Sequence, residues 1–492
     1  MDSLGDTVWD VVICGTGLQQ SLLALSLSRS GKKILHIDPN EYYGGPDAAF
    51  SLQETEAWVG RHAAPSSGLF KSASITKPEG STGLSFSRAY SLALAPQLIH
   101  SRSKLLSQLV SSRAYKQVEF LAVGSFFTFK PAADPEQKPT LARVPSTRED
   151  IAFEASLSLK AKRGLMKFLK FVLDYEGEAQ RGVWGPHTDS PFNDFLQKEF
   201  KMDSDLQKYI ITLTLSLDGE MSTKDGLAII YRHLTSMGFF GPGFAAVYPK
   251  WGGISEIAQV ACRAGAVGGA VYMLGTGIQA EETSSNDIQL QLTSGDTVKT
   301  KLLVRDNDKE EGTFSVSRLV AIVASPLKAL FESVVEGAPL PAVSVTAFPA
   351  GSLRTDADEP YDYPVSVAVH SSDTGECPSG QSLLYFSTLS TPRSKEALNK
   401  ALDSFLQAVN DEQMPERLFE LYYEQGRGSV ASHVDGRVLT LPNVPPSLAF
   451  DDAALDPIKT AWEVAMGEDT ANTEYMMFPD REAALDDEMY DD

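Results

Sequence analysis

Hydrophobic positions near the start of the chain change their spacing twice within a short stretch. Residues 10–14 form a compact apolar run rich in β-branched residues, which is typical of a buried strand. Residues 18–27 then place apolar side chains at helical spacing, and Gly31 ends that helix. A second apolar run follows at 33–37 and ends at Asp38. The pattern predicts a β-α-β unit with two parallel strands.

The turn after the first strand carries two glycines, Gly15 and Gly17. In dinucleotide-binding folds such glycines admit a pyrophosphate at the helix N-terminus, and an acid like Asp38 binds a ribose hydroxyl. The third glycine of that fingerprint is replaced by Gln20, whose long polar side chain would lie near the pyrophosphate. We therefore expect a dinucleotide-binding fold with a vestigial loop and no bound flavin or nicotinamide.

Helical spacing dominates residues 146–238, where a capping box at 146–149 is followed by several amphipathic stretches. One apolar face has the spacing i, i+3, i+4 and i+7 and consists of Leu165, Phe168, Leu169 and Val172. A second helix begins at 190–191, a third apolar stripe follows, and 222–225 caps a fourth helix. Four consecutive helices predict a separate all-helical domain inserted into a larger one.

A second signature follows this helical segment. Gly252 and Gly253 predict a turn into an amphipathic helix that extends through Arg263. On that helix Glu256, Gln259 and Arg263 lie at i, i+3 and i+7 and form one polar stripe. The pattern alone fits either a solvated face or a surface that binds a partner.

The rest of the chain returns to strand patterns. Before the helical segment, a helix is expected at 98–110 and a strand at 118–129 that breaks at 124–125. After it, a hairpin is expected over 278–304, a buried strand at 318–325, further strands within 344–387 and a helix at 396–406. We expect an α/β protein. Its main domain would comprise residues 1–145 and 239–478, its helical domain 146–238, and an acidic, disordered tail 479–492.

Composition narrows the functional classes. The net charge of −22 argues against nucleic acid and against unaided docking on an anionic membrane. No apolar run is long enough to cross a bilayer, and the N-terminus does not resemble a secretory signal. Three cysteines without paired spacing suit a reducing compartment, and seven scattered histidines indicate no metal site. We expect a cytoplasmic protein.

Three motifs resemble one known family. They are CGTGL at 14–18, LHID at 35–38 and YYGG at 42–45, and they resemble the start of the Rab GDP-dissociation inhibitors and Rab escort proteins. The resemblance continues with gaps to about residue 345. It implies a flavoprotein-like fold, as a rule without flavin, that binds Rab GTPases in their GDP form.

The resemblance also implies a set of partner-binding residues. Members of the family carry a Glu, a Gln and an Arg at the spacing of Glu256, Gln259 and Arg263 as part of a Rab-binding platform. Tyr43 and Met273 match two further platform positions. Gly268 departs from the family, which usually has an aromatic residue there. A carboxylate, an amide and an arginine can fix the register of a partner, while Tyr and Met add adaptable apolar contact.

The helical domain would receive a geranylgeranyl group, because burying a prenyl chain contributes about 0.8 kcal/mol per methylene. Leu165, Phe168, Leu169 and Val172 are the candidate prenyl-binding residues, although such stripes also arise from helix packing. Phe192 lies where escort proteins use a Phe to contact the Rab geranylgeranyltransferase heterodimer, although it could equally be a core residue. Residues 162–176 and the chain length also resemble the escort branch.

We therefore expect a Rab escort protein, a non-catalytic accessory subunit that presents Rab GTPases for prenylation and contacts membranes only transiently. No nucleophile–base pair or metal cluster stands out in the sequence. One alternative is a Rab GDP-dissociation inhibitor that recycles prenylated Rab from membranes. A more distant alternative is a flavin-dependent oxidoreductase, such as an amine oxidase or desaturase.

Overall fold

The computed structural model describes most of the chain: residues 4–64, 68–78, 80, 83–132, 134, 136–145, 151, 157–284, 287–306, 310–333, 335–356, 358–409, 413–428, 433–444 and 446–479. The predicted capping box at 146–149 lies outside these residues, as does the predicted tail beyond residue 479.

The predicted β-α-β unit forms the centre of an eight-stranded sheet. The strand order is β10-β2-β1-β13-β12-β11, with β20 also paired to β13 and β19 to β20. Strands β10, β2, β1, β13 and β20 pair in parallel. The bounds are β1 Val8–Cys14, β2 Ile34–Asp38, β10 Val271–Leu274, β11 Ile278–Thr283, β12 Ile288–Leu292, β13 Thr297–Asp306, β19 His433–Asp435 and β20 Val438–Leu441.

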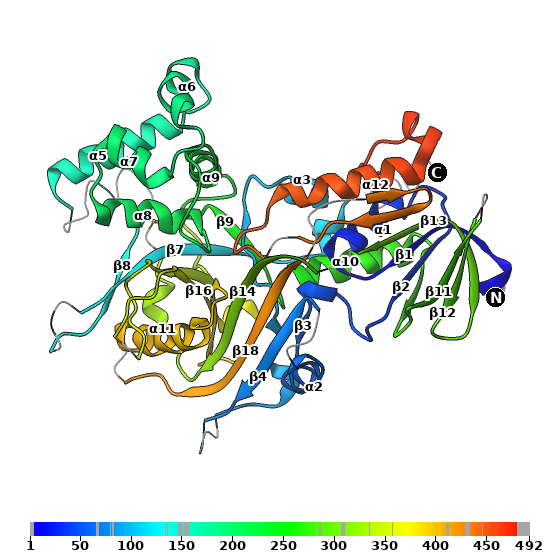
Figure 1. Cartoon of the computed structure of the whole chain (residues 1–492), viewed down its shortest axis with the longest axis horizontal. Helices are drawn as coiled ribbons and strands as arrows, with labels where there is room; N and C mark the ends of the chain where they lie inside the picture. Colours follow the sequence, from blue (N-terminus) through cyan, green and yellow to red (C-terminus); the bar gives the residue numbers. More distant parts are fainter. Residues whose placement is uncertain are drawn as a thin grey trace, which may run out of the picture.

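Three helices cover one face of this sheet (Figure 1). They are α1 (Leu18–Leu27), α10 (Ile254–Val267) and α12 (Asp456–Met466). Their buried side chains share one hydrophobic cluster with the strand residues Val11, Ile13 and Ile34. All of α1 is buried, including its polar residues Gln19, Gln20, Ser21 and Ser26, so this helix has no solvent-exposed face.

The end of the chain completes the unit that the start begins. β20 extends the sheet beside β13, and α12 packs against α1 through a cluster that includes Ile458, Trp462 and Met466. The strand and the helix that close this layer therefore come from residues more than four hundred positions after β1.

A second, ten-stranded sheet has the order β4-β18-β14-β17-β16-β15-β7-β9-β6, with β8 paired to β7. Helix α11 (Ser394–Ala408) covers it at one end, and α2 (Leu52–His62) lies beside β4. The bounds are β4 Phe70–Thr76, β6 Ile99–His100, β7 Phe120–Lys130, β8 Thr140–Arg143, β9 Ala246–Pro249, β14 Glu310–Val323, β15 Val343–Phe348, β16 Val365–Ser371, β17 Ser382–Leu389 and β18 Arg417–Gly428. The short strands β3 (Ala49–Phe50) and β5 (Leu92–Ala93) pair with each other.

The helices of residues 159–236 lie between β8 and β9 in the chain (Figure 1). They are α5 Leu159–Val172, α6 Glu178–Trp184, α7 Phe192–Phe200, α8 Ser204–Thr214 and α9 Thr223–Ser236. Ser222 caps α9 as expected, because its hydroxyl accepts from the Asp225 N–H at 3.1 Å. The short helix α6 is additional to the four predicted ones.

Two local predictions were wrong. The helix expected at 98–110 is shorter: α3 spans Lys104–Ser111, whereas Ile99–His100 is β6 and pairs with β9. Leu98 instead bonds to the distant segment around Leu448, with N–O distances of 3.0 and 2.8 Å. The strand expected to break at 124–125 is continuous, because β7 accommodates an irregular register with β15 there. In both places long-range pairing overrides the local pattern.

Within the described ranges, no helix combines the length and the apolar character needed to span a membrane.

Gly226 of α9 packs closely against the Phe192 ring of α7. A Cβ atom at Gly226 in α9 would lie 2.5 Å from Cδ1 of the Phe192 ring. We expect Gly226→Ala to lower the free energy of unfolding by about 1–3 kcal/mol through overpacking, although alanine has the higher helix propensity. Urea unfolding measures this change.

The matched control is Gly182→Ala in α6, because a Cβ atom at Gly182 meets no atom within 4 Å. We expect this control to raise the free energy of unfolding by up to about 1 kcal/mol, because alanine has the higher helix propensity and meets no neighbour there. Equal effects of the two substitutions would contradict the packing contact.

Candidate functional site

The turn between β1 and α1 is fixed by Asp38 at the end of β2. Its carboxylate accepts from the Thr16 backbone N–H at 2.7 Å, from the Thr16 hydroxyl at 2.6 Å and from the Asn40 N–H at 2.7 Å. Asp38 is 1% exposed. Asp38, the predicted ribose-binding acid, therefore accepts hydrogen bonds from its own chain. These bonds fix the turn that also contains Gly15 and Gly17.

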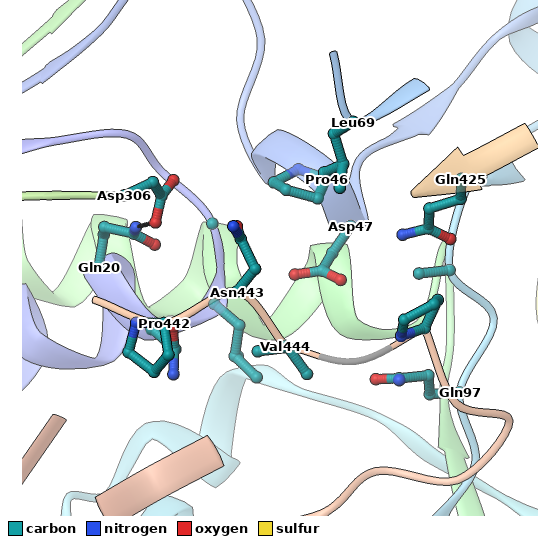
Figure 2. Close-up of a pocket in the computed structure, with 15 residues that line it drawn as sticks. Gln20, Pro46, Asp47, Leu69, Gln97, Asp306, Gln425, Pro442, Asn443 and Val444 are labelled. Carbon is teal, nitrogen blue, oxygen red and sulfur yellow. Dashed lines mark hydrogen bonds between the residues drawn. The ribbon is translucent and has the colours of Figure 1, made fainter. Parts of the chain in front are cut away.

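The N-terminus of α1, where a pyrophosphate would lie, is surrounded by acidic groups. The Gln20 amide donates to the Asp306 carboxylate at the end of β13 (Figure 2). The Asp47 carboxylate lies near the Leu18 N–H, which opposes the rise of its pKa. Gln20, Asp47 and Asp306 line a cavity of only about 30 Å³, close to the volume of one water molecule. The adjoining open cleft is larger and includes Asp38.

These residues do not fit a flavin dinucleotide. Two carboxylates would repel the phosphates that the helix N-terminus normally attracts, and Asp38 is already bonded within the turn. The loop formed by Gly15, Gly17 and Asp38 is therefore a structural element of the sheet. Among the described residues, no group of three or more His, Cys, Asp or Glu could hold a metal ion.

The polar stripe on α10 is present as the spacing predicts. Arg263 and Glu256 form an ion pair with an N–O distance of 3.0 Å, and their side chains are 60% and 18% exposed. Burial raises the pKa of Glu256, and the neighbouring Arg263 opposes that rise. The Gln259 amide donates to the Ser255 hydroxyl at 3.3 Å. The stripe thus presents a cation, a carboxylate and an amide on one surface.

Tyr43 lies beside this stripe. The loop that carries it is tied to the β1–α1 turn, because the Gly44 N–H donates to the Thr16 carbonyl at 3.1 Å. Burial raises the pKa of the Tyr43 hydroxyl, and the nearby Cys262 on α10 and Asp38 add to that rise. Tyr43 is half-buried, so part of the side chain stays available to a partner.

Met273 lies around the edge of the sheet from these groups. On the edge strand β10 its neighbour Tyr272 packs in a tilted arrangement against His36, with 4.8 Å between ring centroids, and approaches Gly265 of α10. Met273 pairs with Ile37 and packs in the cluster on the opposite face of the sheet. The structure therefore gathers four of the five predicted platform residues and turns the fifth to the other face.

Gly268 has a steric reason for lacking a side chain. A Cβ atom there would lie 2.2 Å from the Ser28 carbonyl oxygen at the end of α1. An aromatic residue at this position would require α10 to move away from α1.

The predicted contacts of the helical segment are all buried. Phe192 is 1% exposed and lies 6.2 Å from the Phe168 ring, and Leu165, Leu169 and Val172 belong to the same cluster. In this structure these side chains pack α5, α7 and α9 together. Phe192 cannot touch a partner without rearrangement of the helices.

A cavity beside these helices was not predicted from the sequence. It measures about 400 Å³ and lies between α8, α9 and residues 446–451. Its apolar lining includes Leu215, Leu217, Met221, Ile229, Leu448 and Phe450, and its polar lining includes Asp218, Glu220, Arg232 and Asp451. His100 also lines it, is 3% exposed, and has no hydrogen-bond partner within the part of the chain that the structure describes. No local signal could reveal it, because its walls are more than two hundred residues apart.

Asp47 gives the site a pH-dependent stability. Burial raises its pKa to about 6, while the Leu18 N–H and the buried Arg318 oppose the rise. The folded state therefore holds its proton more tightly than the unfolded chain, and the resulting stabilisation is lost as pH rises through about 6.

We compare the free energies of unfolding of the wild type and of Asp47→Asn. The difference, wild type minus variant, should decrease as the pH rises from 4 to 7. The fall should be no more than about 3 kcal/mol, because one pKa unit corresponds to about 1.4 kcal/mol. Urea unfolding of both proteins across this pH range measures it. A difference that is constant with pH would contradict the assignment.

Comparison with known proteins identifies the family. The family model described as GDP dissociation inhibitor matches residues 5–334. "Rab proteins geranylgeranyltransferase component A" of Saccharomyces cerevisiae is 30% identical over 410 residues, covering 81% of this chain and 65% of that protein. The chain thus spans slightly less than two thirds of the length of this relative.

Two solved structures share the fold. A Rab GDI from Plasmodium falciparum has a TM-score of 0.65 at 18% identity. The match covers 92% of this chain and 97% of the Plasmodium chain. An oxidoreductase from Methanosarcina mazei has a TM-score of 0.58 at 13% identity, with coverages of 92% and 99%. The predicted flavoprotein-like, dinucleotide-binding fold is confirmed. Because the family model matches the chain from the β1–α1–β2 unit through β14, the protein belongs to the GDP dissociation inhibitor family.

Proposed function

We propose that the chain is a Rab escort protein, which binds Rab GTPases in their GDP form and presents them to a geranylgeranyltransferase. The observation that carries the proposal is the Glu256–Gln259–Arg263 stripe, which is exposed at Arg263 and has Tyr43 beside it, in a member of this family. A relative named component A of the transferase favours the escort role over the recycling role.

The platform comprises Tyr43, Glu256, Gln259 and Arg263, with Met273 supporting its edge from the opposite face. The ion pair with Glu256 holds the Arg263 guanidinium in one orientation. Little conformational entropy is lost in forming this pair, because the Glu256 carboxylate is already half-buried. A preorganised arginine can bind a carboxylate or a backbone carbonyl of the GTPase through two donors. Tyr43 adds an amphipathic contact at the same surface.

The cavity of about 400 Å³ is the candidate site for the geranylgeranyl group. Its apolar lining suits a prenyl chain, and burial keeps the His100 imidazole neutral because it lowers the pKa of His100 well below the ordinary value. The charged residues Asp218, Glu220, Arg232 and Asp451 form the polar part of the same lining. The stripe Leu165, Phe168, Leu169 and Val172 would then contribute indirectly, as the packed core that holds the cavity walls.

Presentation to the transferase would use the helical segment. Phe192 is buried, so it would act by holding α7 against α9 rather than by direct contact. The chain would act as a non-catalytic accessory subunit, with the prenyl transfer performed by its partner. Its location would be cytoplasmic, with transient membrane association.

We expect Arg263→Ala to weaken binding of GDP-loaded Rab by about 30-fold or more, the effect of losing one hot-spot residue. The exposed side chain makes no core contact, so the melting temperature should stay unchanged. Calorimetric titration measures the affinity. Arg88→Ala, an exposed arginine outside the platform, is the control and should bind as the wild type does. Equal affinities of Arg263→Ala and wild type would contradict the platform.

A prenylation assay separates the two roles. Transferase, unmodified Rab and labelled geranylgeranyl diphosphate are mixed with and without the chain, and we expect label in Rab only when the chain is present. Phe192→Ala should reduce labelling, because the cavity it leaves costs about 3–5 kcal/mol of stability. No labelling, together with extraction of prenylated Rab-GDP from membranes, would establish the recycling inhibitor instead.

A further inference from the structure

The outer face of α5 differs in charge from the rest of the molecule. This helix contains Lys160, Lys162, Arg163, Lys167 and Lys170 and no acidic residue, whereas the whole chain carries a net charge of −22. Lys167 is directed toward α7, with its ammonium 5.3 Å from the Phe200 ring centroid. Within the ranges described above, Arg163 and Lys170 are exposed and form no ion pair.

The same face exposes a line of large apolar side chains. Leu159, Met166 and Leu173 are 75%, 40% and 45% exposed. They recur every seven residues, which is two helical turns, so they lie along one stripe. Arg163 and Lys170 each follow one of them by four positions and therefore flank this stripe.

The inner face of α5 supplies the side chains by which this helix packs into the core. Leu165, Phe168, Leu169 and Val172 fill the core on that side, and all four are buried. The outer apolar stripe contributes nothing to this core. Its exposure is therefore a property of the surface that packing does not require.

We propose that this α5 surface, defined as Leu159, Arg163, Met166, Lys170 and Leu173, docks on an anionic lipid surface. Cations beside an apolar stripe are the combination that binds headgroups and enters the headgroup–acyl boundary. A convex helix face also matches a flat lipid surface without needing a groove in the partner. Three partly exposed apolar residues support a weak, reversible attachment rather than permanent anchoring.

The rest of the chain makes this docking directional. The excess negative charge repels an anionic surface from the other faces, so attraction is confined to the orientation that presents α5. α5 lies at the opposite end of the long axis from the eight-stranded sheet (Figure 1). The proposal rests on the proposed function in one respect: docking would bring the helical segment, and the cavity beside it, toward the membrane that receives the prenylated GTPase.

The test is co-sedimentation of the full chain, without Rab, with vesicles of phosphatidylcholine alone or with added phosphatidylserine. We expect binding to the phosphatidylserine vesicles and release at high salt. The double variant Arg163→Gln with Lys170→Gln should lower the partition coefficient of the protein onto the phosphatidylserine vesicles about 25-fold. The matched control, Arg88→Gln with Lys299→Gln, removes the same charge from exposed positions of the main domain and should leave it unchanged.

A second pair of variants tests the apolar stripe. Leu159→Ser with Met166→Ser should weaken binding to the same vesicles, whereas Leu340→Ser, at a residue that is 73% exposed elsewhere, should not. All of these side chains are exposed, and circular dichroism verifies that each variant is folded.

Binding that is absent, or that the α5 variants do not alter, would overturn the proposal. Loss of transferase binding with unchanged vesicle binding would assign the surface to an acidic protein partner instead. The Rab-GDP affinity of the same variants is measured separately. Failure of wild type to bind Rab would remove the proposed function but would leave the lipid result standing.

Discussion

The first turn of α1 must have its free backbone N–H groups satisfied, and much of the structure depends on how this chain does so. An acidic group of the chain itself, Asp47, lies near the Leu18 N–H at the position where a dinucleotide phosphate would otherwise lie. Asp38 bonds to Thr16, and Thr16 in turn holds the Gly44 N–H. The loop that carries Tyr43 is therefore fixed by the same hydrogen bonds that close the former nucleotide loop.

The sequence predicted the parts of the fold that depend on local periodicity. The β-α-β unit, the hairpin around 294–296 and the polar stripe on α10 follow from spacing alone, because a helix or a strand fixes which side chains share a face. The replacement of the third glycine by Gln20 also pointed correctly to an altered loop, since this amide bonds to Asp306. The residue that lies near the helix end, Asp47, carries no such local signal.

The remaining features depend on contacts between distant segments. Met273 matched a family position. Because side chains alternate between the two faces along the edge strand β10, Met273 lies on the opposite face from Tyr272. Phe192 was singled out by the resemblance of its segment to escort proteins, and that resemblance does not separate a core residue from a surface contact. The helical segment shares its hydrophobic cluster with Val123 and Phe126 of β7. The hydrophobic core therefore continues across the boundary that the sequence predicted between the helical domain and the main domain.

The late position of β20 and α12 has a consequence for how the protein is made. These elements complete the layer around β1 and α1, yet they are the last parts of the described chain to be synthesised. Until then β13 has one edge unpaired and α1 has one face uncovered, which is the situation that exposes a chain to aggregation and slows folding. Nascent chains would need protection of this apolar surface until translation ends.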